Sequence, residues 1–193
     1  MSTAAVDSTL MRVITPRPST THSTTHNTVH STAHNTLRRI HSPIGRIELR
    51  SNGAAITALT IESRGSLPAD HVAENSDALL DLAAAQLAEY FRGARTVFEV
   101  PVSPRGSAFQ QAVWLELLAL PYGTVTSYGE LGRATGRAAA GRAVGGAVGR
   151  NPIPIIIPCH RVLASDLRIT GYSGGEGVPT KEWLLALEGI AHK

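Results

Sequence analysis

Pro101 and Pro104 divide the chain into a part in which strand-like alternation surrounds one helical stretch and a part that begins with short helices. Before them, residues 44–50 alternate apolar and polar side chains, residues 51–53 (SNG) are typical of a turn, and residues 54–61 alternate again. This arrangement predicts a β-hairpin. Residues 76–92 then show helical spacing up to Gly93, and residues 96–102 are strand-like. We expect a small α+β unit over residues 37–103.

Short helices are predicted after Pro104, within a second unit that covers residues 104–193. Capping boxes at residues 107–110 and 127–130 each begin a helix, and a third helix is predicted over about residues 137–149. The last two helices, joined by a glycine-containing turn, match a helix-turn-helix. Residues 152–158 are predicted to form a buried strand or extended run, and a strand pair is expected to flank the turn at residues 165–166. A final helix is predicted over residues 181–188.

Residues 1–36 differ in composition from the rest of the chain. The stretch from Thr20 to Thr36 consists almost wholly of Thr, Ser, Asn and His, so we expect a disordered tail. Four histidines recur there at every fourth position, at His22, His26, His30 and His34. On a helix they would share a face that could bind a metal, whereas the composition favours a low-complexity repeat.

Composition excludes several classes of protein. The 193 residues contain no apolar run approaching the roughly 18 that span a membrane, and no typical secretion signal. A single cysteine, Cys159, excludes an internal disulfide and a cysteine-rich zinc site. We therefore expect a soluble cytoplasmic protein with one thiol, and no metal or cofactor.

Basic charge is concentrated in the predicted helix-turn-helix and the segment after it. The whole chain has 18 basic and 15 acidic residues, a net charge of +3. Residues 127–168 alone hold six arginines and two acidic residues, a net of +4. Such a block on this motif is typical of DNA binding, and a solvated surface is the alternative.

The predicted third helix is unusually rich in glycine. Its sequence is RAAAGRAVGGAVG, and each interior glycine costs about 1 kcal/mol relative to alanine. One face would carry only small residues and one arginine: Ala138, Arg142, Gly145 and Gly149. A bare face with one projecting cation suits a DNA groove, with the arginine entering the base stack. Tight packing against another helix is the alternative.

The most specific stretch of the sequence surrounds the cysteine. Residues 151–162 read NPIPIIIPCHRV, an apolar run between prolines that ends in a thiol, an imidazole and a guanidinium. A nearby base or positive charge raises the thiolate fraction of a cysteine. A reactive cysteine and a buried structural cysteine are both compatible with this pattern.

Several motifs together resemble the O6-alkylguanine-DNA alkyltransferase family. They are NPIPIIIPCHRV, the preceding RAVGGA, the following GYSGG, FQQAVW at residues 109–114, PYGTVTSY at 121–128 and KEWLLALEG near the end. The resemblance covers about residues 40–190. It implies an RNase-H-like N-terminal domain and a C-terminal helix-turn-helix domain that carries the active-site cysteine.

The resemblance also implies a set of catalytic residues. Cys159 corresponds to the thiol that accepts the alkyl group, and His160 to the base that activates it through a water molecule. Glu188 corresponds to the carboxylate that orients the imidazole, although a solvated helix carboxylate is the alternative. Tyr128 corresponds to the tyrosine that rotates a phosphate and donates to N3 of guanine. Asn151 corresponds to the hinge between the recognition helix and the cysteine loop.

DNA and substrate contacts follow from the same resemblance. Arg142 corresponds to the arginine finger that replaces the extruded nucleotide, and Ala138, Gly145 and Gly149 share its helix face. Tyr172 and Ser173 correspond to the loop that donates a hydrogen bond to the guanine oxygen.

The implied function is stoichiometric repair of O6-alkylguanine, with O4-alkylthymine as a further substrate, in duplex DNA after base flipping. No cofactor is implied, and we expect a monomer in solution with cooperative binding to DNA as an open question. A helix-turn-helix regulator without catalysis is the main alternative. A cysteine hydrolase is a second, but it would need an oxyanion hole that the sequence does not reveal.

The chain departs from the family pattern in four places. With one cysteine it has neither the zinc site nor the second alkyl-accepting cysteine of some members. Leu167 stands where relatives commonly have a turn glycine, which puts the turn at residues 165–168 in doubt. The segment 176–180 is about two residues longer than in the family, so the resemblance does not predict the shape of the pocket rim. The Thr/His-rich tail has no counterpart.

Overall fold

The computed structural model describes residues 36–137 and 141–193. The predictions for the tail before Thr36, including its histidine repeat, lie outside these ranges, as does Ala138. No helix within the described ranges is both long enough and apolar enough to span a membrane.

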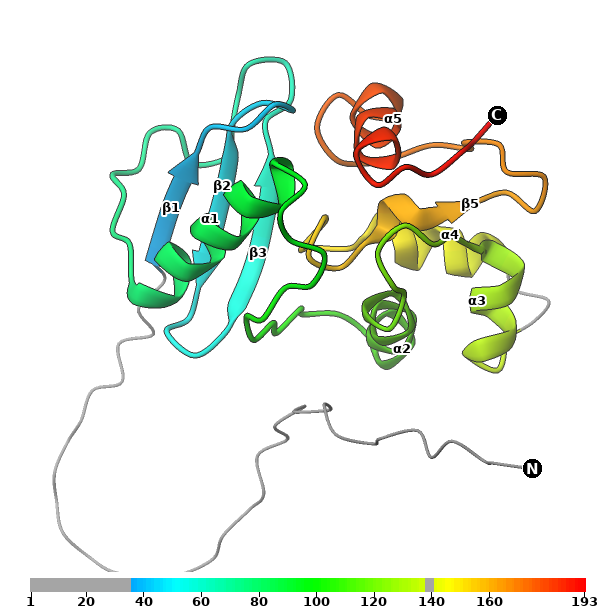
Figure 1. Cartoon of the computed structure of the whole chain (residues 1–193). Coiled ribbons are helices and arrows are strands. Elements are labelled where there is room, and N and C mark those ends of the chain that lie inside the picture. The colour runs from blue at the N-terminus through cyan, green and yellow to red at the C-terminus, as the bar shows by residue number, and fades with distance from the viewer. Residues whose placement is uncertain (1–35, 138–140) are drawn as a thin grey trace, which may run out of the picture. The chain divides into compact units, whose positions relative to one another are not determined.

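The N-terminal part contains the predicted hairpin and one additional strand. Strands β1 (Thr36–Ile40), β2 (Ile47–Ser51) and β3 (Ile56–Ile61) form an antiparallel sheet in that order (Figure 1). Gly53 lies in the turn between β2 and β3 with φ +85°, a conformation that glycine adopts without strain. Strand β1 was not predicted from the sequence, and it begins at Thr36, one residue before the predicted start of the folded part.

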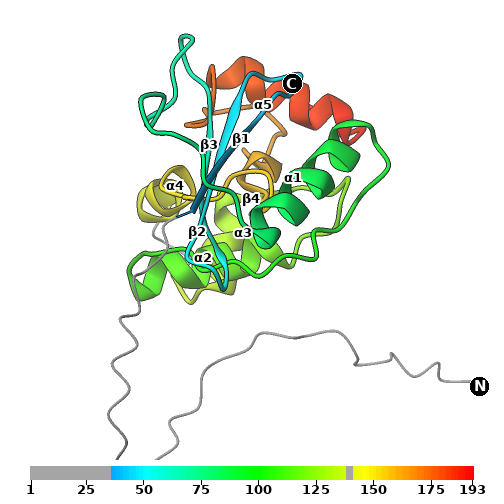
Figure 2. The ribbon, with the colours of Figure 1, turned by 90° about the vertical axis from the view of Figure 1, so that its left-hand side faces the viewer.

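Helix α1 (Ala78–Phe91) confirms the helix predicted before Gly93 and packs against β1 and β2 (Figure 2). Asp77 caps its N-terminus by accepting a hydrogen bond from the amide of Leu80. The helix buries an apolar face against the sheet, including Leu80, Ala83 and Leu87.

Residues 96–102 do not form the predicted strand. Only Val102 makes an isolated bridge, to Ile56 of β3. Pro101 provides a carbonyl to the amide of Ile56 but has no amide hydrogen to donate, so the pairing cannot extend through it.

Three short helices follow in the C-terminal part: α2 (Ala108–Leu118), α3 (Tyr128–Ala134) and α4 (Gly141–Gly149). Both predicted capping boxes are present, at Ser107 of α2 and Ser127 of α3. Helix α4 contacts α2 and α3, which gives the predicted helix-turn-helix arrangement. The buried indole of Trp114 in α2 donates to the carbonyl of Ala147 in α4 at 2.9 Å.

The third helix was predicted to start at about Arg137, and its described part, α4, follows residues 138–140, which lie outside the described ranges. Arg137 lies outside a helix, where its amide donates to the carbonyl of Gly132 at 2.6 Å. Its guanidinium lies over the ring of Phe109, 4.7 Å from the ring centroid.

Residues 152–158 are buried as predicted but do not form a strand. Ile155 has φ +73°, which a β-branched residue rarely adopts, so the segment turns rather than extends. The strand pair expected around Ser165 is also absent from the described residues. Instead β5 (Val162–Leu163) pairs in parallel with β4 (Thr126–Ser127).

The turn at residues 164–168 closes with leucine in place of glycine. The amide of Leu167 donates to the carbonyl of Ala164, and φ of Leu167 is +66°. Leucine therefore takes the left-handed conformation that glycine adopts freely, at a cost of about 1–2 kcal/mol.

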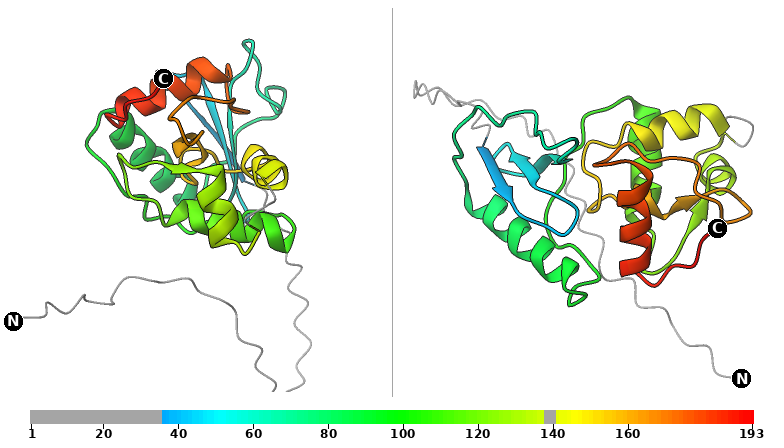
Figure 3. Two further views of the ribbon diagram at one scale, coloured as in Figure 1. Left: turned by 90° about the vertical axis from the view of Figure 1, so that its right-hand side faces the viewer. Right: turned by 90° about the horizontal axis from the view of Figure 1, so that it is seen from above.

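Helix α5 (Val178–Leu187) begins three residues before the predicted Lys181 and ends at Glu188 and Gly189, as expected. It lies beside the 3₁₀ turn at Cys159–Arg161 (Figure 3, right). The ring of Trp183 in α5 packs on that of Phe91 in α1, with centroids 5.8 Å apart. Helix α5 thus connects the cysteine loop to the helix that covers the sheet.

Candidate active site

Asn151 holds the loop that presents the cysteine. Its side-chain amide donates to the carbonyl of Ile157 at 2.8 Å, and its oxygen accepts from the amide of Ile153 at 3.0 Å. Asn151 follows α4 almost directly, so these two bonds fix the cysteine loop to the end of that helix. This is the place predicted for the hinge residue.

One cavity of about 250 Å³ brings most of the candidate residues together. The sequence-predicted residues that line it are Tyr128, Gly145, Gly149, Cys159, Tyr172 and Ser173. Val148, Thr170, Gly171 and Lys181 complete the wall. The cavity is smaller than the roughly 300–1,000 Å³ of sites for drug-sized ligands, so it suits a single flat ring system.

Cys159 lies at this cavity with only 3% of its surface exposed. Burial raises the pKa of its thiol, while Asn151, Tyr172 and the charge of Lys181 act in the opposite direction. The hydroxyl of Tyr172 is near enough to favour the thiolate, yet it makes no hydrogen bond of ordinary length with any described residue. The thiol therefore depends on its neighbours for ionisation.

His160 is fully buried behind the cysteine and bonds to Glu188. The distance from its Nε2 to Oε1 of Glu188 is 2.9 Å. Burial lowers the pKa of His160, so the imidazole is neutral and Nε2 carries the hydrogen that the carboxylate accepts. Its Nδ1 makes no hydrogen bond with any described residue, which leaves a lone pair to accept a proton.

Glu188 is buried and accepts hydrogen bonds from several directions. Besides His160, the hydroxyl of Tyr90 donates to it at 2.8 Å and the amide of Gly123 at 3.2 Å. Burial opposes its ionisation, but the bonds from His160 and Arg161 outweigh burial and hold its pKa at about 2. The alternative of a solvated helix carboxylate is therefore wrong.

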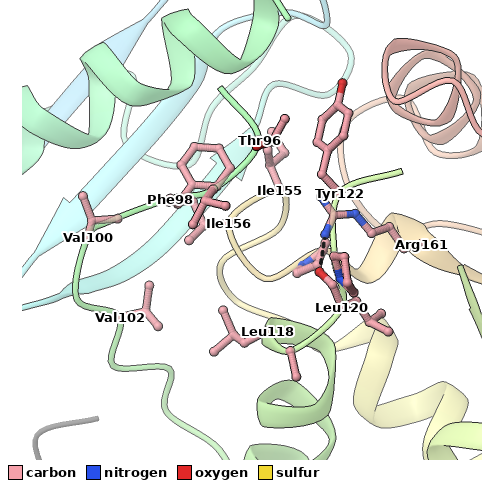
Figure 4. Close-up of a pocket in the computed structure, with 14 residues that line it drawn as sticks. Thr96, Phe98, Val100, Val102, Leu118, Leu120, Tyr122, Ile155, Ile156 and Arg161 are labelled. Carbon is pink, nitrogen blue, oxygen red and sulfur yellow. Dashed lines mark hydrogen bonds between the residues drawn. The ribbon is translucent and has the colours of Figure 1, made fainter. Parts of the chain in front are cut away.

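Arg161 also belongs to this network, although its role was not predicted from the sequence. Its Nε donates to Oε2 of Glu188 at 2.7 Å, and a second nitrogen donates to Oε1 at 2.9 Å. A third nitrogen donates to the carbonyl of Leu120 at 2.8 Å (Figure 4). The sequence feature that could have identified Arg161 is its position directly after His160. Because Arg161 neutralises Glu188, the carboxylate orients His160 without making it a strong base.

Arg161 also lines a second cavity, of about 270 Å³, that shares no lining residue with the first (Figure 4). Its wall is largely apolar and includes Phe98, Val100 and Ile156. Since the guanidinium is already bonded to Glu188 and Leu120, this cavity presents no free charge from Arg161.

Two hydroxyls connect the loop over the cavity to the helix-turn-helix. Ser173 donates to the carbonyl of Gly149 at 2.9 Å, and Thr170 donates to the hydroxyl of Tyr128 at 3.1 Å. Thr170 was not predicted. Its bond leaves the Tyr128 proton free to donate in turn to a ligand.

The glycines of α4 are not explained by packing within the described protein. A Cβ added at Gly141 or Gly149 would meet no atom within 4 Å, and one at Gly145 would meet only the ring of Tyr128, at 3.9 Å. Helix packing therefore fails as the alternative for this face. Arg142 is exposed in the same helix and does not line the cavity. The structure thus separates Arg142 from the cysteine, on a face open to a partner.

Metal ligands do not cluster anywhere in the described residues: no group of three His, Cys, Asp or Glu side chains could hold an ion.

Comparison with known protein families accounts for both parts of the chain. Residues 36–104 match the 6-O-methylguanine DNA methyltransferase ribonuclease-like domain, and residues 108–190 match the DNA-binding domain of the same family. The chain belongs to this methyltransferase family. The family resemblance and the α+β fold predicted from the sequence are thereby confirmed.

Individual members of this methyltransferase family also match most of the chain. The methylated-DNA–protein-cysteine methyltransferase of Mycobacterium tuberculosis is 42% identical over 151 residues, which cover 78% of this chain and 90% of the relative. The constitutive enzyme of Bacillus subtilis is 36% identical over 156 residues, covering 79% and 94%. Two solved mycobacterial structures each have a TM-score of 0.71 and cover 79% of this chain and 92% of their own: O6-methylguanine methyltransferase, at 42% identity, and OGT in complex with DNA, at 44%.

Proposed function

We propose that this protein repairs DNA by transferring the alkyl group of O6-alkylguanine irreversibly to Cys159. One observation carries the proposal: a cavity of the size of a base contains the single thiol and lies beside an exposed glycine-rich helix. The membership in the family and the DNA complex of a relative support it.

Recognition begins on the helix-turn-helix. The bare face around Gly145 and Gly149 lets the backbone of α4 approach a groove closely, and Arg142 projects from that helix. Because the alkyl group is hidden in a duplex, the nucleotide is flipped into the cavity, and Arg142 fills the space that it leaves. Ala138 would share this surface, although it lies outside the described residues.

The chemistry is a nucleophilic displacement at carbon. The proton of the Cys159 thiol passes through a water molecule to Nδ1 of His160, whose Nε2 bonds to Glu188. The thiolate attacks the alkyl carbon, so an S–C bond forms and the C–O6 bond breaks with its electron pair on the oxygen. Tyr128 donates a hydrogen bond to N3, which stabilises the leaving guanine. The guanine anion takes up one proton from water, and His160 returns the thiol proton to water and becomes neutral again. Tyr172 and Ser173 bound the cavity next to O6.

Each molecule acts once because a thioether is stable and no hydrolytic group lies in the cavity wall. No cofactor takes part in this scheme. We extend the proposal to O4-alkylthymine, which presents an alkyl group on a ring oxygen in the same way. We further propose that the protein is a monomer in solution. Its single unpaired thiol suits a reducing cytoplasm. We propose domain bounds at residues 37–103 and 104–193.

The test is to incubate the protein with a duplex that contains one O6-methylguanine and to assay the DNA for restored guanine. We expect one guanine restored per protein molecule. A Cys159→Ser variant should bind the duplex equally well and restore none, since the thiol contacts no phosphate. A regulator without catalysis would bind in both forms and restore none in either, which would overturn the proposal.

A further inference from the structure

The loop at residues 171–177, called the cavity loop below, supplies Gly171, Tyr172 and Ser173 to the wall of the cavity that contains Cys159. Its sequence, GYSGGEG, contains four glycines. Glycine leaves the backbone more conformations than any other residue, so this loop has little stiffness of its own. Its position at the cavity therefore depends on the bonds that connect it to the rest of the protein.

Two side chains of the cavity loop bond to distant parts of the chain. Ser173 donates to the carbonyl of Gly149 at the end of α4, at 2.9 Å. The carboxylate of Glu176 accepts a hydrogen bond from the amide of Arg64, after β3, at 2.6 Å. The amide of Glu176 in turn donates to the buried hydroxyl of Thr180 at 3.0 Å. Ser173 thus connects the loop to the helix-turn-helix, and Glu176 connects it to the N-terminal part.

Close packing accompanies the bond of Glu176. A Cβ added at Gly175 would lie 3.0 Å from Cγ2 of Ile61 and 2.6 Å from Oγ1 of Thr180, nearer than side chains normally approach. Ile61 is the last residue of β3 and belongs to the hydrophobic core. The cavity loop therefore lies directly against the end of the sheet, next to the residue that bonds to Arg64.

The turn that contains Arg64 presents its amide outward. Ser63 and Ser66 exchange two backbone hydrogen bonds, at 3.1 and 3.0 Å, so Arg64 and Gly65 are the central residues of a tight turn. Their φ angles are +52° and +74°, both positive as in a type I′ turn. Arginine is uncommon at the first central position, where glycine, asparagine and aspartate prevail. The amide at that position has no partner within the turn, and Glu176 supplies one.

Arg46 holds this turn against the sheet. Its guanidinium donates to Glu62 and to Asp70, each at 2.7 Å, and to the carbonyl of Gly65 at 3.2 Å. Its backbone amide also donates to Glu62, at 2.9 Å. Charge-assisted hydrogen bonds of this kind are stronger than neutral ones. The partner of Glu176 is therefore fixed in place, whereas the glycine-rich loop that carries Glu176 is not stiff by itself.

We propose that Glu176 is a positioning residue that fixes the cavity loop to the N-terminal part and thereby sets the affinity of the cavity for the flipped base. This inference rests on the proposed function and adds a residue to it. Glu176 does not line the cavity, so it acts through Tyr172 and Ser173. Without its bond the loop occupies further conformations, and the apparent affinity for the base falls in proportion to the fraction of molecules that remain competent to bind.

Hydrogen exchange tests the bond itself. The amide of Arg64 should exchange faster in Glu176→Ala than in the wild type, because the variant has no side-chain acceptor. Glu176→Gln keeps an oxygen that can accept and should retain most of the protection. Unchanged exchange in Glu176→Ala would show that the bond does not persist in solution, which would overturn the inference.

DNA binding tests the consequence. In a Cys159→Ser background no alkyl transfer occurs, so the ratio of affinities for duplex with and without O6-methylguanine reports binding in the cavity. We expect Glu176→Ala to lower this ratio about fivefold, which corresponds to about one competent loop in five molecules, and to leave the affinity for the unmodified duplex unchanged. Glu176→Gln should lower the ratio less. Two controls should match the parent: Arg64→Gly, which keeps the amide, and Glu182→Ala, at an exposed carboxylate on α5.

Three results would overturn this consequence. A glutamate that only stabilises the fold would lower the thermal stability of Glu176→Ala without changing the ratio. An equal fall in Glu176→Ala and Glu176→Gln would mean that the accepted hydrogen bond is not the cause. A parallel loss of affinity for both duplexes would place the effect on the DNA-binding surface. Failure of the proposed function is distinct, since wild-type protein would then take up no methyl group at all.

Discussion

The hydroxyl of Tyr90 in α1 donates to the carboxylate of Glu188 at the end of α5, at 2.8 Å. Tyr90 belongs to the ribonuclease-like part, and the same carboxylate bonds to the histidine next to the cysteine. The N-terminal part of the chain therefore reaches the active site through one buried hydrogen bond. This gives a role to a part that supplies none of the residues lining the cavity of Cys159.

Tyr90→Phe should destabilise the protein by about 1.5–3 kcal/mol, the usual range for a hydrogen bond to a charged group. Alkyl transfer should slow only modestly, because His160 and Arg161 still hold the carboxylate. Urea denaturation measures the first effect and single-turnover kinetics the second. Tyr122→Phe is the matched control, since its hydroxyl donates to the carbonyl of Leu187 and not to Glu188. A loss no greater than in the control would contradict a special role for Tyr90.

Glu188 should make folding stability depend on pH in the acidic range. Its pKa is about 2 in the folded protein against an ordinary 4.5, so its contribution is complete above pH 4.5 and is lost as the pH falls towards 2. Glu188→Gln should lose about 3 kcal/mol at neutral pH, because Arg161 is left buried without its partner. Denaturation between pH 2 and 7 measures both. Glu182→Gln, exposed on the same helix, is the control. An equal acid dependence in wild type and Glu188→Gln would contradict the assignment.

Gly145→Ala should trade DNA affinity for stability. Alanine replaces glycine within a helix at a gain of up to about 1 kcal/mol, and the new Cβ lies at ordinary contact distance from Tyr128. The same methyl group projects from the face proposed to meet DNA, so duplex binding should weaken. Thermal unfolding and a binding titration at fixed salt measure the two effects. Stabilisation with unchanged affinity would remove this face from the interface.

Arg142→Ala should separate base flipping from chemistry. Unstacking a base costs a few kcal/mol, so transfer from duplex DNA should slow steeply without the residue that fills the gap. Transfer from free O6-methylguanine needs no flipping and should be far less affected. Arg150→Ala, at another exposed arginine just after α4, controls for loss of general charge. Equal losses on duplex and free base would mean that Arg142 shapes the cavity instead.

Local sequence signals predicted the elements that depend on local physics. The two capping boxes, the hairpin turn at Gly53 and the end of α5 at Gly189 each follow from a few adjacent residues, and all are present. The failures depend on partners distant in the chain. Strand β1 pairs with the edge of β2, which local pattern does not reveal, and the segment at residues 152–158 is buried and turns at Ile155.

The residues of the candidate site also fall into those that the sequence predicted and those that it did not. Motif resemblance named the thiol, its histidine and Glu188, but local pattern could not show that Glu188 is buried. Arg161, Tyr90 and Lys181 were not assigned, because each acts through contacts between segments far apart in sequence. Lys181 in particular looks like an ordinary solvated helix lysine within KEWLLALEG. Only its burial distinguishes it.

The most direct test of the account is the intact mass of the protein after incubation with excess duplex containing O6-methylguanine. The account predicts a single added methyl group, located on Cys159 by peptide mapping, with no further addition as substrate or time increases. Repeated turnover with unmodified protein, or a methyl group on any other residue, would contradict it.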